Sequence, residues 1–128
     1  MGYESKLIVI LQTPIDLIDG RKDYINQMIA IYDCCKLGHD FNYKIFTDKI
    51  KGNLYVPFVD DDEKITEDRY GDELKATYDI DKLIKELERS EKASHYRRLP
   101  PLINMLKALR KAQKNKEWGD LMVVHFGY

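Results

Sequence analysis

The sequence has few of the features that identify a protein class at once. Its two cysteines, Cys34 and Cys35, are neighbours, and so they cannot form an ordinary long-range disulfide with each other. We expect reduced, buried and structural thiols, as in a cytoplasmic protein. No apolar run approaches the roughly 20 residues that a bilayer requires, and the first residues lack the basic and apolar regions of a signal peptide. These absences favour the cytoplasm of a cell and no membrane partner.

Catalytic and cofactor motifs are also missing. The chain contains no G-x-x-x-x-G-K-[ST], G-x-G-x-x-G, G-x-S-x-G or C-x-x-C sequence. Its histidines, His39, His95 and His125, are far apart and follow no metal-binding spacing. We therefore expect no cofactor and no metal. A small enzyme that uses His125 or His95 with an acidic partner is the least favoured hypothesis, because a histidine in an apolar strand such as His125 is more often half-buried and hydrogen-bonded.

The composition is that of one globular domain spanning residues 1–128. Hydrophobic residues make up 44% and charged residues 34% of the 128 positions, and the net charge is −1. A chain of this length buries roughly two-thirds of its unfolded surface, which is enough for a core without a staple. The 14 aromatic residues (nine Tyr, four Phe and one Trp) exceed what such a core needs. The surplus indicates a binding surface or the interface of a homo-oligomer.

The first half of the chain predicts strands. Residues 6–12 are apolar and β-branched, which is typical of a buried strand, and Pro14 and the Asp19-Gly20 pair are expected to end it. Residues 24–38 fit either a helix or a strand, and we favour a strand over 27–33 because the Asp-Gly turn indicates a hairpin. Residues 38–53 are predicted to form a loop. Two further strands are predicted over 54–59 and 64–67, the first at an edge because it contains Pro57.

The second half predicts two helices and a last strand. Ile80, Leu83, Ile84 and Leu87 recur with the helical period, and Asp79 is a good N-cap. A second helix opens at Pro100 and Pro101 and extends to about residue 116, and residues 121–126 read as a strand inserted in the sheet. The fold class is therefore α+β: an antiparallel sheet of four to five strands, with two helices packed on one face and the C-terminal strand in the sheet.

Charge is segregated along the chain. Residues 60–91 carry 13 acidic and 6 basic residues, a net of −7, whereas residues 92–116 carry 8 basic residues and none that are acidic. The residues around 60–72, which we call the acidic strip, do not match an EF-hand loop, and a solvated turn explains their charge as well as a cation site does. We predict that the acidic strip contacts a partner, through Asp60, Asp61, Asp62, Glu67, Asp68, Arg69 and Tyr70.

The basic block begins with a short polar cluster, and it has two interpretations. Arg97 and Arg98 offer forked donors, Tyr96 offers a stacking face, and His95 lies beside them, so these four residues form a candidate site for a phosphorylated ligand. The alternative is a surface helix whose charges serve solubility or pair with the acidic residues. A nucleic-acid-binding module that uses the basic helix over 102–116 is the alternative function for the same block.

Two stretches resemble small uncharacterised proteins of phages and prophages of Gram-positive bacteria. They are the opening Met-Gly-Tyr-Glu-Ser-Lys-Leu of residues 1–7 and the closing Trp-Gly-Asp-Leu-Met-Val-Val-His-Phe-Gly-Tyr of residues 118–128. Residues 65–72 and 96–101 fit the same resemblance. It implies a phage accessory protein in the cytoplasm of a bacterial host, a class that includes inhibitors of host defence.

Together, these features predict a non-catalytic protein that acts by stoichiometric binding. In one version, the acidic strip mimics nucleic acid and blocks a basic surface of a host defence protein. In the other, His95, Tyr96, Arg97 and Arg98 sequester a nucleotide signal at a subunit boundary.

Overall fold

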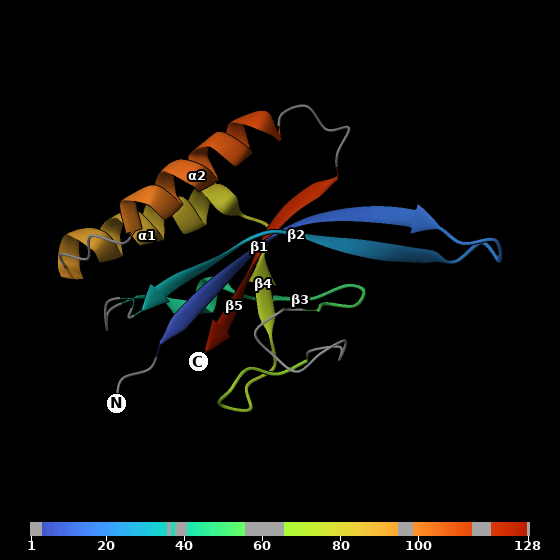
Figure 1. Cartoon of the computed structure of the whole chain (residues 1–128), viewed down its shortest axis with the longest axis horizontal. Coiled ribbons are helices and arrows are strands. Elements are labelled where there is room, and N and C mark those ends of the chain that lie inside the picture. The colour runs from blue at the N-terminus through green and yellow to red at the C-terminus, as the bar shows by residue number, and fades with distance from the viewer. Residues whose placement is uncertain are drawn as a thin grey trace.

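A computed structural model of the chain describes residues 4–35, 37, 41–55, 66–94, 99–113 and 119–127. Five strands form one sheet in the order β2-β1-β5-β4-β3, and every neighbouring pair is antiparallel. The elements in chain order are β1 (Ser5–Asp16), β2 (Lys22–Cys35), the 3-10 helix η1 (Tyr43–Ile45), β3 (Asp48–Lys49), β4 (Lys75–Thr77), α1 (Ile80–Ser94), α2 (Leu99–Ala112) and β5 (Asp120–Gly127). The predicted α+β class, the antiparallel sheet and the C-terminal strand are confirmed (Figure 1).

The first two strands form a long hairpin, which confirms the strand over 27–33 and rules out the helix over 24–38. The prediction that Pro14 ends the first strand is wrong, because Pro14 lies in β1 opposite Tyr24. The β1–β5 pairing stops at Gln12, and the Tyr24 N–H donates to Asp23 in its own strand rather than to β1. The missing N–H of Pro14 therefore costs no ladder bond, and the hairpin projects beyond the rest of the sheet (Figure 1).

The central strands carry apolar side chains on both faces. One face contributes Leu7, Val9, Leu121 and Val123 to a core that also contains the buried side chains of α1 and α2. Both helices thus cover the same face, as predicted (Figure 1). The opposite face packs Ile8, Ile10, Met122, Val124 and Phe126 against Ala76 of β4 and against Leu54 and Leu74, which precede that strand.

The helices begin where the sequence predicts. The Asp79 side chain accepts a hydrogen bond from the Lys82 N–H at 3.0 Å, which confirms the N-cap of α1. Pro100 and Pro101 lie in the first turn of α2, where their missing N–H groups have no intrahelical partner to lose.

The sheet edge beyond β5 differs from the prediction. Leu54 and Tyr55 belong to no strand, and residues 56–65, which include most of the two predicted strands, lie outside the described residues. Glu67 makes only an isolated bridge with Glu73. The strands found here, β3 and β4, are two and three residues long, too short to display an alternating pattern. Residues 41–53, predicted as a loop, are irregular apart from η1 and β3.

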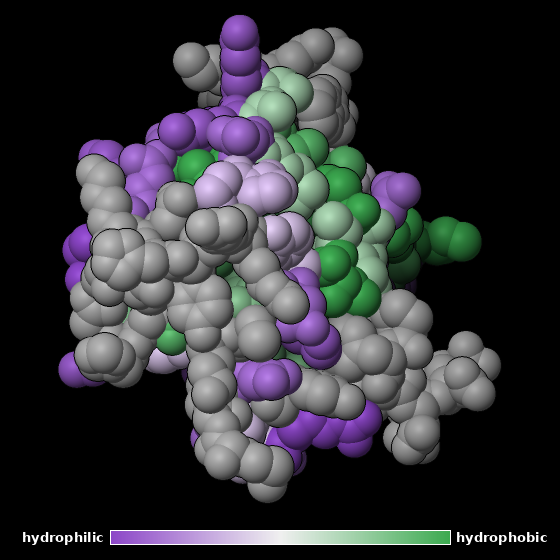
Figure 2. Space-filling view, turned by 60° about the vertical axis from the view of Figure 1, so that its left-hand side comes forward, coloured by the Kyte–Doolittle hydropathy of each residue, from purple (hydrophilic) through white to green (hydrophobic). Residues whose placement is uncertain are grey.

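The surface is mixed in character. Figure 2 shows hydrophobic side chains in a band beside strongly hydrophilic ones. Among the described residues, the large hydrophobic side chains left exposed are Ile18, Ile25, Ile29, Tyr55 and Tyr70. Cys34 is buried and in no disulfide, as predicted for a structural thiol.

Candidate functional site

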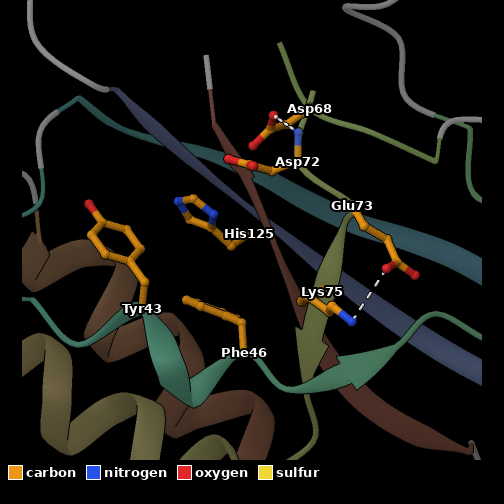
Figure 3. Close-up of a pocket in the computed structure, with 7 residues that line it drawn as sticks. All are labelled: Tyr43, Phe46, Asp68, Asp72, Glu73, Lys75 and His125. Carbon is orange, nitrogen blue, oxygen red and sulfur yellow. Dashed lines mark hydrogen bonds and ion pairs between the residues drawn. The ribbon is translucent and has the colours of Figure 1, made fainter. Parts of the chain in front are cut away.

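A pocket opens at the end of β5, between η1 and the turn that leads into β4. Its volume is about 240 Å³, and its lining combines aromatic rings with charged groups (Figure 3). The residues that line it are Tyr43, Phe46, Asp68, Asp72, Glu73, Lys75 and His125.

Aromatic rings form one wall of this pocket. The rings of Tyr43 and Phe46 lie 5.0 and 5.3 Å from that of His125, and Phe41 packs edge-on against Tyr43 from behind. The segment that carries them is tied to α1, because the Asn42 N–H donates to Glu86 at 2.9 Å. The wall is therefore built by packing before any ligand arrives.

His125 is a half-buried, uncharged member of that wall. Its Nε2 lies 2.9 Å from the Ser5 hydroxyl, whose oxygen is also 3.4 Å from the Tyr43 hydroxyl. Burial lowers the pKa of His125 from 6.5 to about 4, although the Asp68 carboxylate acts in the opposite direction. The imidazole is therefore neutral at pH 7. Burial likewise raises the pKa of the Tyr43 phenol, against the effect of its hydrogen bond to Ser5.

Asp68 organises the turn that forms the opposite wall. Its Oδ1 accepts hydrogen bonds from the N–H groups of Tyr70 and Asp72, at 2.8 and 3.1 Å. Its Oδ2 accepts the Gly127 N–H at 3.3 Å, and the Arg69 N–H donates to the Gly127 carbonyl. The Asp68 carboxylate thus fastens residues 66–74, which we call the acidic turn, to the end of β5.

The remaining charged groups of the pocket differ in whether an ion pair neutralises them. Glu73 and Lys75 form an ion pair at 3.5 Å, and Figure 3 shows Glu73 directed away from the rings. Asp72 is directed toward His125 in the same view and makes no ion pair with any residue that the structure describes. Asp72 therefore supplies an exposed negative charge beside the aromatic wall.

The structure brings only part of the predicted partner site to this place. Asp68 lines the pocket, whereas Glu67, Arg69 and Tyr70 are exposed elsewhere on the acidic turn. Asp60, Asp61 and Asp62 lie outside the described residues, as do all four predicted ligand-binding residues, His95, Tyr96, Arg97 and Arg98.

Sequence reasoning missed most of the pocket. Tyr43 and Phe46 belong to residues 38–53, which the sequence predicts as a loop, and Asp72 is one of the many acidic residues over 60–91. No local signal connects them with His125, which is 82 residues from Tyr43 in the chain, because the β1–β5 pairing and the packing of η1 create the contact.

Ser5, His125 and Asp68 are the residue types of a hydrolytic triad, but a substrate cannot reach the serine. Ser5 has no exposed surface, so no substrate carbonyl can reach its hydroxyl. The hydrogen bonds that the Asp68 carboxylate accepts all come from backbone N–H groups. Within the described ranges, no group of three or more His, Cys, Asp or Glu residues is placed to hold a metal ion.

The basic side chains of α2 are partly neutralised by α1. Lys107 lies 3.0 Å from Glu88, and Arg110 lies 3.4 Å from Asp81. These pairs fit the interpretation in which the basic residues form ion pairs with the acidic residues that precede them in the chain.

No family model, curated protein or solved structure matches the chain. None of the helices in the described part is long and apolar enough to cross a membrane.

Proposed function

We propose that this protein is a non-catalytic binding protein whose acidic turn contacts a positively charged surface of another protein. The observation that carries the proposal is the construction of the turn. Asp68 holds the turn through hydrogen bonds to its backbone, while Glu67, Asp72, Glu73 and Tyr70 stay exposed. A surface ordered before binding loses little conformational entropy on association.

Binding is favoured over catalysis by the state of the reactive groups. The Ser5 hydroxyl is inaccessible, and the His125 imidazole is neutral, half-buried and hydrogen-bonded to it. A general base needs a pKa near the working pH, and a nucleophile needs access. These groups therefore suit a structural role.

The partner class follows from charge and from the resemblance to phage proteins. A rigid acidic surface with an exposed tyrosine complements a lysine- and arginine-rich surface, such as one that ordinarily contacts nucleic acid. In a phage accessory protein, that surface belongs to a protein of the bacterial host, and a host defence protein is the target we propose.

The alternatives have less support. The nucleotide-sequestering version depends on His95, Tyr96, Arg97 and Arg98, which lie outside the described residues. The nucleic-acid-binding version depends on the basic helix, where Lys107 and Arg110 are already paired with acids of α1. The nucleic-acid-binding version also requires an affinity for DNA or RNA that falls steeply as the salt concentration rises.

A capture experiment in Gram-positive host cells tests the proposal. The affinity-tagged protein is compared with the double variant Glu67→Gln/Asp72→Asn and with the control Asp16→Asn/Asp48→Asn, which removes equal charge from exposed sites off the turn. We expect the wild type and the control to retain a basic protein in stoichiometric amount, and the turn variant to lose it. Equal retention by all three proteins would refute the proposal.

A further inference from the structure

The pocket beside the acidic turn has the chemistry of a receptor for one organic cation. Its aromatic wall consists of the Tyr43, Phe46 and His125 rings, and Asp72 points toward them from the facing turn (Figure 3). Aromatic faces attract cations through the ring quadrupole, and a nearby carboxylate adds a charge-assisted hydrogen bond.

The charge of the lining selects against anions. Three carboxylates, Asp68, Asp72 and Glu73, line the pocket together with one ammonium group, that of Lys75. The Glu73–Lys75 pair cancels internally, and Asp68 faces backbone N–H groups, which leaves the Asp72 carboxylate to meet a ligand. A phosphate entering here would meet uncompensated negative charge.

The size of the pocket limits what can enter it. Its volume of about 240 Å³ lies below the range of about 300–1,000 Å³ that is typical of sites for drug-sized ligands. It therefore suits the end of a side chain better than a nucleotide. A planar guanidinium can stack on a ring while it donates to a carboxylate, whereas an ammonium group has no flat face to stack.

We propose that the pocket receives the guanidinium of an arginine side chain presented by the partner protein. The inference rests on the proposed function, because the arginine comes from the basic surface that the acidic turn contacts. The arginine stacks on the ring of Tyr43 and donates to the Asp72 carboxylate.

The first test is a titration of the isotope-labelled full chain, followed by NMR. The probes are Nα-acetyl-arginine amide, its neutral isostere Nα-acetyl-citrulline amide, and Nα-acetyl-lysine amide. We expect saturable shifts at Tyr43 and His125 with the arginine compound, weaker binding of the lysine compound and none of the citrulline compound. Shifts of equal size and midpoint with citrulline, or none with arginine, would overturn the inference.

Matched variants separate a specific site from general attraction. Asp72→Asn should weaken arginine binding about two- to fivefold, the range expected for one exposed ion pair. Asp48→Asn removes the same charge from an exposed site outside both the pocket and the acidic turn, and it should leave the affinity unchanged. Tyr43→Leu should weaken binding, and Tyr43→Phe, which keeps the ring, should not. Equal effects of Asp72→Asn and Asp48→Asn would overturn the inference.

The titration and the capture experiment can give opposite results, and each combination has its own meaning. Capture that depends on the turn, with no arginine titration, overturns the pocket assignment and leaves the binding function. Arginine titration, with capture that ignores the turn, refutes the binding function and leaves the ligand class of the pocket.

Discussion

The half-buried imidazole of His125 should make the stability of this protein sensitive to mild acid. In the folded chain its pKa is about 4, whereas in the unfolded chain it returns to about 6.5. The unfolded state therefore binds a proton that the folded state rejects as the pH falls through this window. Stability from this group is fully present above about pH 6.5, and it is lost progressively down to about pH 4.

The size of the effect follows from the two pKa values. A difference of this magnitude corresponds to a total loss of about 3 kcal/mol, of which about 2 kcal/mol is already lost at about pH 5. Most carboxylates are still ionised at that pH, so the loss can be assigned to histidine. For a domain whose net stability is about 5–15 kcal/mol, such a loss is readily measured.

The assay is urea unfolding at about pH 7.5 and about pH 5 in two variants. The double variant His39→Gln/His95→Gln keeps His125 as its only histidine. The triple variant adds His125→Gln, which preserves a polar partner for Ser5. We expect the double variant to lose about 2 kcal/mol more between the two pH values than the triple variant does. Equal losses, or an NMR titration midpoint of His125 near its ordinary value of 6.5, would refute the reasoning.

Three other perturbations test the fold. Gly119→Ala should destabilise the domain by more than about 1 kcal/mol in urea unfolding, because Gly119 has a φ of +96° and an added Cβ would collide with the Gln12 carbonyl oxygen; an unchanged midpoint would contradict this geometry. Tyr78→Phe removes a 2.7 Å hydrogen bond to the side-chain oxygen of Gln12, which is 2% exposed, and should cost about 1–3 kcal/mol by the same measurement. A loss within experimental error would mean that water replaces the phenol. Deleting residues 121–128 removes most of β5, the strand between β1 and β4, and should abolish cooperative thermal unfolding followed by circular dichroism; a melting curve like that of the full chain would show that β5 is dispensable.

Local patterns in the sequence account for much of the architecture. The apolar β-branched run in β1, the helical spacing of Ile80, Leu83 and Leu87, and the Asp79 cap each act over a few neighbouring residues. They predict β1 and α1, and equally local features, namely the Asp-Gly turn, the Pro100-Pro101 pair and the apolar run over 121–126, predict the hairpin, α2 and β5. The same local logic failed at Pro14, because its tolerance depends on β5 ending before it reaches that part of β1.

The pocket belongs to the tertiary structure alone. Tyr43, Asp72 and His125 come from η1, the acidic turn and β5, and no spacing in the chain relates them. Likewise, the interpretation of His125 as a half-buried, hydrogen-bonded histidine is confirmed, but its partner Ser5 lies 120 residues away, and antiparallel pairing of the first and last strands brings them together. Periodicity determined which side chains face the core, since it depends only on backbone geometry. Which polar groups meet at the end of the sheet was decided by strand order, because contacts between distant segments form only when the whole sheet closes.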